Sequence, residues 1–421
     1  MAVSRPGRHP GADRGAPLRA AELHRVLVVR ADNLGDVVMA TPVLGALREF
    51  APHARIDLLA SPAGSAVAPM IPELDGVLTV SPSWQQLGGS ATGDAERELV
   101  ERVRTRRYDA MIVLTSFSQS PWPVAHVGLL AGVPVRAVHS SEFGGAVATH
   151  WVTPPADTTH QVDRGLHLLA ALGIPDRGRA PRLRIPDADD RAGAALLGDL
   201  ARAPFAVLVP GASCATRRYP AARFGAAAAA IAAAGLPVRV AGPAAEEALV
   251  AEVVATARSA GGARIGAARS AGGARIDAAR SAGGARIDAS GRPDVAALPP
   301  TTVPRFAAVV RRATVVVTNN SGGMHLADAL GTPVAVAWAG TERPGDMNPR
   351  AVPAALLGAP VPCSPCRLLT CPYGHECLDV EPEALAAAAC RLARGPEGEE
   401  EPWPPIPSQV TRGPALTPSG S

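Results

Sequence analysis

The chain has 421 residues, with 42 glycines and 42 prolines, 47% hydrophobic residues and only 3% aromatic residues. Its formal net charge of +3 is too small to indicate a nucleic-acid-binding protein, which normally carries a clustered basic surface. None of its 41 basic residues is a lysine, which excludes a P-loop lysine, a Schiff-base lysine and a lysine general base.

The first twenty residues are rich in Arg, Gly and Pro and lack the apolar core of a signal peptide, so we expect a disordered tail over 1–20. The longest bland apolar run, 225–235, is mostly alanine and is much shorter than the ~20 residues that span a bilayer. These features predict a cytoplasmic protein.

Two stretches of the chain alternate short apolar runs with helical segments. The first, 21–186, has predicted strands at 25–30, 55–60, 76–81, 109–115 and 135–139. The second, 187–394, has predicted strands at 205–210, 237–241, 313–318 and 333–338, after a candidate linker at 181–204. Strands that alternate with helices predict an α/β fold with two tandem parallel sheets, each covered by helices on both faces. Ligands of such sheets bind at the carboxyl ends of the strands.

Residues 257–289 repeat an eleven-residue unit three times, with paired glycines in every copy. Each glycine costs a helix ~1 kcal/mol, and one isoleucine per copy buries little apolar surface. We therefore expect a flexible insertion over 257–297. The last segment, 395–421, contains many prolines and a run of glutamates, and it is predicted to be a second disordered tail.

The first candidate for chemistry is Asp36, which follows the first predicted strand and precedes an amphipathic helix predicted over 37–49. A carboxylate at this point can cap the helix through backbone amides. It can also accept a proton from an attacking hydroxyl, although a helix N-terminus favours its ionised form and limits its basicity. The residue type permits both roles.

Two further turns follow strands of the second half. Arg217 and Arg218 lie in the loop 210–220, where a pair of guanidinium groups can clamp a diphosphate or form a solvated basic turn. The turn after strand 313–318 contains Ser321, Gly322 and Gly323 before His325. Small side chains there let a ligand approach backbone amides at the start of a helix, where an anion is favoured. His325 could bind a phosphate oxygen or serve only in packing.

Four of the six cysteines lie within fifteen residues near the C-terminus, with His375 among them. Thiolate pairs at such spacing suit a structural zinc ion, whereas irregular gaps and a reducing compartment also suit free thiols. Both interpretations stay open for Cys363, Cys366, Cys371 and Cys377.

Three separated segments together resemble the ADP-heptose:lipopolysaccharide heptosyltransferase family, glycosyltransferase family 9. They are R-A-D-N-L-G-D-V-V-M-A-T-P at 30–42, the loop 210–220, and T-N-N-S-G-G-M-H-L-A-D-A-L-G at 318–331. The segments H-Q-V-D-R at 160–164 and C-S-P-C…C-P-x-G-H-x-C match more variable features of the family. The resemblance covers roughly 25–394, apart from the repeat.

The resemblance implies a GT-B fold, with the acceptor on the first domain and the nucleotide-sugar on the second. It implies inverting transfer of a heptose from an ADP-sugar to a glycan or glycolipid of the cell envelope, without a catalytic metal or other cofactor. A peripheral position at the inner membrane surface is compatible with such an acceptor. Asp36 matches the general base. The donor-binding positions that match are Thr216, Arg217, Arg218, Glu246, Asn320, Ser321, Gly322, Gly323 and His325.

Two positions depart from the family pattern. Arg217 replaces a usual lysine, which keeps the charge and adds a planar fork. Asn320 stands where the family often has aspartate, which removes a negative charge near the nucleotide.

Two other functions remain alternatives. One is a dinucleotide-dependent oxidoreductase or sugar-nucleotide epimerase, although the turn at 31–36 lacks G-x-G-x-x-G. The other is a non-catalytic nucleotide-sugar binder, in which Asp36 is only a helix cap.

Overall fold

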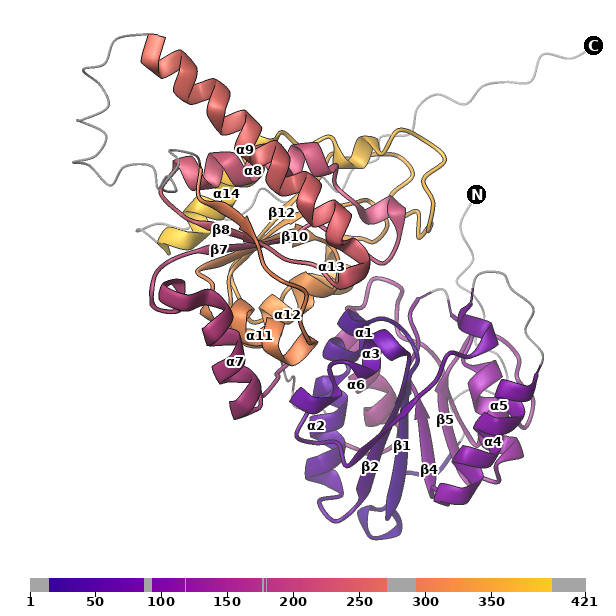
Figure 1. The fold of residues 1–421 in the computed structure, drawn as a ribbon. Coiled ribbons are helices and arrows are strands. Elements are labelled where there is room, and N and C mark those ends of the chain that lie inside the picture. The colour runs from indigo at the N-terminus through magenta and orange to yellow at the C-terminus, as the bar shows by residue number, and fades with distance from the viewer. Residues whose placement is uncertain are drawn as a thin grey trace, which may run out of the picture.

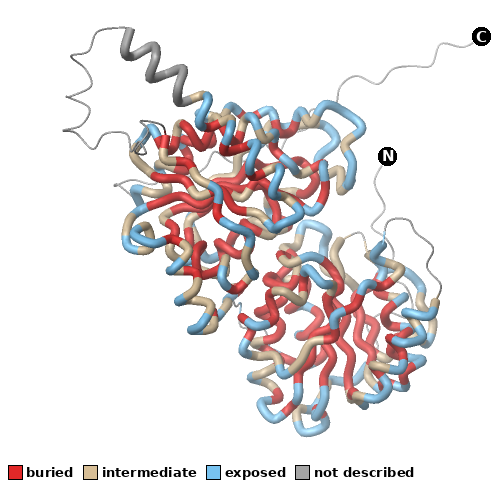
Figure 2. Tube along the Cα trace, in the orientation of Figure 1, coloured by how far each residue is buried: buried red, intermediate tan, exposed pale blue. Residues whose placement is uncertain are grey.

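The computed structural model describes residues 15–86, 93–117, 119–175, 178, 180–270 and 293–395, with only the backbone described for 261–270. The described chain forms two halves, each a six-stranded parallel sheet between helices (Figure 1). Buried residues follow the two sheets and the helix faces that cover them (Figure 2). The predicted α/β class with two parallel sheets, a GT-B architecture, is confirmed.

The first sheet has the order β3-β2-β1-β4-β5-β6. Its first strand is central, because the chain adds β2 and β3 on one side and then β4 to β6 on the other. The strands are β1 (Arg25–Arg30), β2 (Arg55–Ala60), β3 (Gly76–Thr79), β4 (Ala110–Val113), β5 (Val135–His139) and β6 (His150–Val152).

The second sheet repeats this topology, with the order β12-β11-β10-β7-β8-β9. Here β7 is the first strand and β10 pairs on its other side. In each sheet, the order in which the chain adds strands reverses between the first and the fourth strand. Doubly wound sheets bind ligands at this switch point. The strands are β7 (Ala206–Val209), β8 (Val238–Val240), β9 (Val295–Ala297), β10 (Val315–Asn319), β11 (Val334–Ala337) and β12 (Ala354–Leu357).

Alternate residues of β1 face opposite layers of the first half. Val26 and Val28 pack in the core on the face of the sheet that α1, α2 and α6 cover. Leu27 and Val29 pack in the core on the opposite face, against α4 and α5. The helices are α1 (Leu34–Met39), α2 (Thr41–Phe50), α3 (Pro62–Ser65), α4 (Asp94–Arg106), α5 (Trp122–Leu130) and α6 (Gln161–Ala171), with short 3-10 turns at Ala20–Glu22, Ala68–Met70 and Ser83–Gln85.

The second half is built in the same way, with α8, α9 and α14 on one face of the sheet and α7, α11 and α12 on the other. No helix of the described residues is both long enough and apolar enough to cross a bilayer. The helices are α7 (Asp187–Leu197), α8 (Ala221–Ala233), α9 (Glu247–Ser270), α11 (Val303–Arg312), α12 (Gly322–Leu330), α13 (Pro344–Met347) and α14 (Pro382–Arg394), with 3-10 turns at Gly198–Arg202, Ala215–Arg217, Ala244–Glu246 and Glu376–Leu378.

The structure corrects several predicted elements. The edge strands β6, β9 and β12 were not predicted, because each combines three or four residues with at most one β-branched residue, whereas the equally short β8 has two valines. The helix predicted over 37–49 is two helices, α1 and α2, that meet at Ala40. Pro42 has no amide hydrogen and lies in the first turn of α2, which is where a proline is tolerated. The predicted linker 181–204 contains α7, which packs on α11.

Two segments predicted to lack structure are ordered in part. In the predicted tail 1–20, the backbone amide of Leu18 donates to Leu172 (2.8 Å), and Ala16 accepts from His150 (2.8 Å). These contacts hold 15–20 against the first half, and 1–14 lie outside the described residues. In the predicted insertion 257–297, α9 continues to Ser270, and β9 is a strand of the sheet because it pairs with β8. Residues 271–292 and 396–421 also lie outside the described residues.

Helices α7 and α11 approach closely at Gly193, where a Cβ would lie 2.4 Å from Ala308 Cβ and 2.7 Å from the Arg305 carbonyl oxygen. We expect Gly193→Val to lower the free energy of unfolding by about 1–3 kcal/mol, because the backbone of α11 cannot move aside without repacking. Urea unfolding measures the change. Gly345→Val is the matched control, since a Cβ at exposed Gly345 meets open space; equal losses in both variants would contradict the packing argument.

Candidate active site

The two halves meet where the loops after their central strands face each other. Helix α1 follows β1, and α12 follows β10. Gly35 lies so close to the ring of His325 that a Cβ would be 2.5 Å from His325 Cδ2. Gly322 lies against Leu34 in the same way. The motif containing Asp36 and the turn at 318–327 are therefore neighbours in space, as Figure 1 shows for α1 and α12.

A buried guanidinium organises the loop after β1. Arg30 is the last residue of that strand and is 1% exposed. Its Nη2 donates to Asp36 Oδ1 (2.7 Å) and to Ser116 Oγ (3.0 Å), and its Nε lies 3.1 Å from Asp32 Oδ2. Asp32 also accepts hydrogen bonds from Gln119 and Gln85. One cation is thus shared by two neighbouring carboxylates.

Asp36 caps a helix and also faces the second half. Its Oδ2 accepts from the backbone amide of Asn33 (3.1 Å), which forms a capping box at the start of α1. Burial alone would raise the pKa of Asp36, but the charge and hydrogen bond of Arg30 outweigh burial and hold this pKa below its ordinary value. His325 and Arg217 lower it further from across the boundary. Asp36 is therefore ionised at neutral pH.

His325 lies in the first turns of α12, almost fully buried against α1. Burial lowers the pKa of His325 to about 4, although Asp36 acts in the opposite direction. The imidazole is therefore neutral at pH 7 and can offer a neutral hydrogen bond, without a positive charge, to a group at this boundary.

The turn before α12 is fixed by its side chains, and this leaves helix amides free of side-chain caps. Ser321 makes no capping bond, because its Oγ donates to the Gly211 carbonyl (3.2 Å). Asn319 donates to the Pro210 carbonyl (2.8 Å) and accepts from the Tyr219 amide (2.9 Å). The loop 210–220 and the α12 turn are therefore joined into one unit at the ends of β7 and β10.

Arg217 is paired with a buried acid that the sequence analysis did not single out. Its guanidinium forms an ion pair with Glu342, and its Nε donates to Thr341 Oγ1 (3.2 Å). Glu342 is 5% exposed. Asn320 supports this segment, because its Nδ2 donates to the Ala339 carbonyl (3.1 Å) and its Oδ1 accepts from the Ala339 amide (3.1 Å).

This network explains why residue 320 is an amide rather than an acid. Only an amide both donates to and accepts from the backbone of Ala339. The same Nδ2 lies 3.3 Å from Glu342 Oε2, where an aspartate would place two carboxylates in contact. The negative charge absent at Asn320 is present nearby at Glu342.

The other predicted donor residues diverge from Arg217. Arg218 turns back to donate to the Ala212 carbonyl (3.1 and 3.2 Å). The Glu246 carboxylate lies against Gly211, where a Cβ would be 1.9 Å from Glu246 Oε2. Burial raises the pKa of Glu246, and Arg218 opposes that effect. Thr216 is buried, and its Oγ1 makes no hydrogen bond to the described residues. The charges of Arg217 and His325 thus act on Asp36, whereas the charge of Arg218 acts on Glu246.

The cysteine-rich segment lies beside this network. All six cysteines of the chain are free thiols. Within the described ranges, no three His, Cys, Asp or Glu side chains are placed to hold a metal ion. The segment supports the donor-side loops through its backbone, because the Cys366 amide donates to Gly340 (3.1 Å) and the Arg367 amide to Thr341 (3.0 Å).

Four functional candidates have weak signals in the sequence. Arg30 was identifiable as a charge at the end of an otherwise apolar strand, and Glu342 as an acid shortly after another strand. Gln161 and Arg164 belong to the H-Q-V-D-R segment, but spacing alone does not show that they face Arg30. Their lining of a common cavity is a property of the fold.

Comparison with known proteins gives a family match. The model of glycosyltransferase family 9 (heptosyltransferase) matches residues 96–264 and 277–376. Lipopolysaccharide heptosyltransferase 3 of Escherichia coli K12 is 29% identical over 150 residues, which are 34% of this chain and 40% of that protein. The matched segment therefore spans less than half of this relative.

Solved structures resemble the whole fold at low identity. A glycosyl transferase family 9 protein from Veillonella parvula has a TM-score of 0.67 at 19% identity, over 90% of this chain and 99% of that one. The E. coli ADP-heptose lipopolysaccharide heptosyltransferase II has a TM-score of 0.64 at 20% identity, over 88% and 98%. E. coli heptosyltransferase WaaC with ADP has 0.57 at 16% identity, over 88% and 98%.

Two buried histidines predict acid sensitivity. The pKa of His325 is about 4 and that of His139 is about 3, both lowered first by burial. The unfolded chain binds more protons below the ordinary histidine pKa of ~6.5, so the free energy of unfolding falls as pH drops from ~6.5 toward 4. Over that pH range, the two histidines together lower the free energy of unfolding by several kcal/mol at most.

Urea unfolding at pH 7 and pH 5 measures this dependence. We expect His325→Gln and His139→Gln each to lose less stability between the two pH values than the parent chain loses. The surface variant His53→Gln keeps the parent dependence. Unchanged dependence in both buried variants would show that these histidines are protonated in the folded chain.

Proposed function

The chain belongs to glycosyltransferase family 9, and on that premise we propose that it transfers a heptose or related sugar from an ADP-sugar to a hydroxyl of a cell-envelope glycan or glycolipid. The observation that carries the proposal is the convergence of Asp36 with His325, Arg217 and the start of α12. A carboxylate from one half thus faces anion-binding groups of the other half, as acceptor activation and leaving-group stabilisation both require.

The proposed reaction is a single displacement with inversion. The acceptor oxygen attacks the anomeric carbon while Asp36 takes the hydroxyl proton. The bond between that carbon and the diphosphate oxygen breaks, and the diphosphate leaves with the electron pair. The low pKa of Asp36 keeps it ionised and ready to accept the proton. It also makes Asp36 a weak base, so proton transfer accompanies bond formation rather than preceding it.

The proposed donor site uses backbone amides and guanidinium groups. The amides at Gly322 and Gly323 offer the positive end of α12 to the diphosphate, whereas the Ser321 amide donates to the Asn319 carbonyl (2.8 Å). Arg217 supplies a charge-assisted hydrogen bond, and neutral His325 supplies a neutral one. Thr216, with its unpartnered hydroxyl, and Asn320, which supports Glu342, complete the phosphate side. Arg218 and Glu246 are both proposed to contact the nucleoside. With these donors, the proposed mechanism needs no metal or cofactor.

The acceptor class is inferred from the relatives. The curated relative and one of the solved structures are named as lipopolysaccharide heptosyltransferases, which supports an acceptor from the cell envelope. The six free cysteines suit a reducing compartment, so we propose a cytoplasmic reaction, with the enzyme at the inner face of the membrane when the acceptor is a lipid. No role in binding nucleic acid is proposed.

A non-catalytic binder is the second candidate, because Asp36 does cap α1. The two functions differ in what the carboxylate must do. A cap needs only one oxygen that accepts a hydrogen bond, whereas a general base needs the negative charge. Asparagine at residue 36 supplies the first and not the second.

Asp36→Asn therefore separates the two functions. We expect the transfer rate with an ADP-heptose donor to fall by about 10²–10⁴-fold, while the dissociation constant for ADP changes less than about twofold. Rapid-quench product analysis and calorimetric titration measure the two quantities. Asp75→Asn, which removes a carboxylate far from the boundary, is the control and keeps its rate. Normal turnover in Asp36→Asn would remove Asp36 from the mechanism.

The donor side is tested with a charge-neutral pair. Arg217→Ala alone would leave Glu342 buried and unpaired, so we replace both residues in Arg217→Gln with Glu342→Gln, which keeps a hydrogen-bonded pair. We expect ADP to bind about tenfold or more weakly to the double variant, because the charge-assisted contact to the diphosphate is lost. Adenosine should bind both proteins equally. Unchanged ADP affinity would contradict the proposed clamp.

A further inference from the structure

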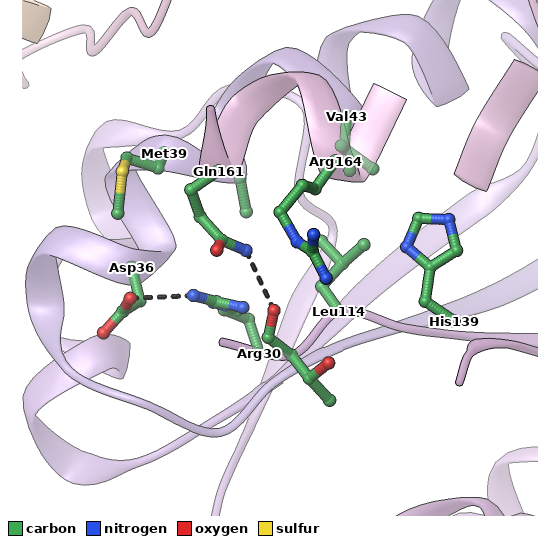
Figure 3. Close-up of a pocket in the computed structure, with 11 residues that line it drawn as sticks. Arg30, Asp36, Met39, Val43, Leu114, His139, Gln161 and Arg164 are labelled. Carbon is green, nitrogen blue, oxygen red and sulfur yellow. Dashed lines mark hydrogen bonds and ion pairs between the residues drawn. The ribbon is translucent and has the colours of Figure 1, made fainter. Parts of the chain in front are cut away.

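A second buried carboxylate contacts the guanidinium that holds Asp36. The Asp32 side chain is 4% exposed, and its Oδ2 lies 3.1 Å from Arg30 Nε. Arg30 Nη2 donates to Asp36 Oδ1 at 2.7 Å, and Figure 3 shows the guanidinium directed at that carboxylate. The proposed reaction assigns a task to Asp36 and none to Asp32.

Loops from four strands hold Asp32 in place. Its Oδ1 accepts hydrogen bonds from Gln119, in the loop after β4, and from Gln85, in the 3-10 turn after β3. Its backbone carbonyl accepts a hydrogen bond from Ser61 Oγ, in the turn after β2. Asp32 itself follows β1, so it lies where the carboxyl ends of four neighbouring strands meet. The carboxylate cannot turn away from Arg30 without breaking these hydrogen bonds.

The cluster of Arg30, Asp32 and Asp36 changes its net charge when Asp36 takes a proton. With both acids ionised, the cluster holds one cation and two anions. A proton on Asp36 makes the cluster neutral, because Asp32 still compensates Arg30, and a buried cluster without net charge is favoured. With an uncharged residue in place of Asp32, the same proton leaves Arg30 buried without either of its ion-pair partners. Asp32 therefore favours the protonated form of Asp36.

The groups that act on Asp32 agree with this coupling. Burial raises the pKa of Asp32, Arg30 lowers it, and the negative charge of Asp36 raises it, so that this pKa lies above its ordinary value. The hydrogen bonds from Gln119 and Gln85 lower the same pKa. An interaction between two ionised groups is reciprocal, so the charge of Asp32 disfavours the ionised form of Asp36 to the same extent.

Asp32 opposes the cations that act on Asp36. Burial raises the pKa of Asp36, whereas Arg30, and then His325 and Arg217 from across the boundary, lower it. These groups keep Asp36 ionised before the reaction, but they also weaken it as a base. A neighbouring negative charge restores part of that basicity without any movement of Asp36.

We propose that Asp32 is a positioning residue for the transfer reaction, which acts through Arg30 and allows Asp36 to hold the proton of the attacking hydroxyl. The inference rests on the proposed function for the reaction, whereas the coupling between the two acids stands without it. In the reaction, the oxygen–hydrogen bond of the acceptor breaks as the bond between that oxygen and the anomeric carbon forms. The proton moves to Asp36, the diphosphate leaves with the electron pair of its bond to the sugar, and Asp32 remains ionised.

Stability measures the coupling without a transfer assay, because asparagine at residue 36 is the neutral counterpart of the protonated acid. We compare urea unfolding at pH 7 of the full chain, Asp32→Asn, Asp36→Asn and the double variant. We expect Asp36→Asn to raise the unfolding equilibrium constant at least about tenfold more when Asp32 is also replaced, because Arg30 then has no carboxylate partner.

The matched control background for this comparison is Asp57→Asn. Asp57 is another buried aspartate that pairs with an arginine, Arg55 on β2, and it lies outside the cluster. We expect Asp36→Asn to cost the same in this background as in the parent chain. An equal cost of Asp36→Asn with and without Asp32 overturns the proposal.

Carboxyl ¹³C NMR of Asp32 is a second measurement, and it needs no folded variant at residue 32. We expect the titration midpoint of Asp32 to fall by about one pH unit or more in Asp36→Asn, because a like charge is removed. Equal midpoints in the two chains overturn the coupling. An Asp32 that is protonated at pH 7 in the parent chain also overturns the proposal, because the cluster would be neutral before the proton arrives.

When transfer is observed, the rates of the same variants test the role in catalysis. We expect Asp32→Asn to lower kcat about three- to tenfold, with less than a twofold change in KM for the donor, because Asp36 becomes a weaker base. In the Asp36→Asn background, Asp32→Asn has no further effect, since residue 36 no longer takes a proton. A merely structural role lowers the rate by the same factor in both backgrounds, and that result overturns the assignment. Coupling of the two acids in a chain without transferase activity keeps the charge cluster and removes its role in the reaction.

Discussion

The arrangement of the boundary depends on one buried cation, Arg30, at the end of the central strand β1. A guanidinium inside the fold is tolerated because Asp36 and Asp32 share its charge, and these acids are tolerated because the guanidinium is there. The ion pairs fix the loop between β1 and α1, and the loop in turn directs Asp36 toward the second half. An arginine is suited to this position because its planar fork contacts two acids from one fixed plane.

In the second half, two amide side chains and one acid fix the loops at the boundary. Asn319 joins the loops after β7 and β10, Asn320 fixes the segment at Ala339, and Glu342 holds Arg217. A diphosphate that binds Arg217 must compete with Glu342 for its guanidinium. In the proposed donor site, the acid would therefore reduce non-specific anion binding and hold Arg217 in place before the donor binds.

The sequence was sufficient for the α/β class and for the tandem sheets, because the strands of a parallel sheet are buried on both faces and read as continuous apolar runs. It also located Asp36, Arg217 and His325 on turns that follow such strands. The edge strands β6, β9 and β12 escaped prediction because each is short and has at most one β-branched residue. The divergence of Arg217 and Arg218 could not be predicted, since the loop 210–220 takes its path from contacts with Asn319 and Ser321, about a hundred residues away in the chain. The cavity at Arg164 depends on packing between α6 and β1, which spacing does not encode.

The eleven-residue repeat lies in a connection that is remote from the boundary between the two halves. Helix α9 ends at Ser270 and β9 begins at Val295, at the outer edge of the second sheet, and the end of α9 points away from the first half (Figure 1). The family match itself is interrupted within the repeat, between residues 264 and 277. The repeat therefore belongs to a connection that leads to an edge strand, and not to β7 or β10, whose following turns form the proposed donor site.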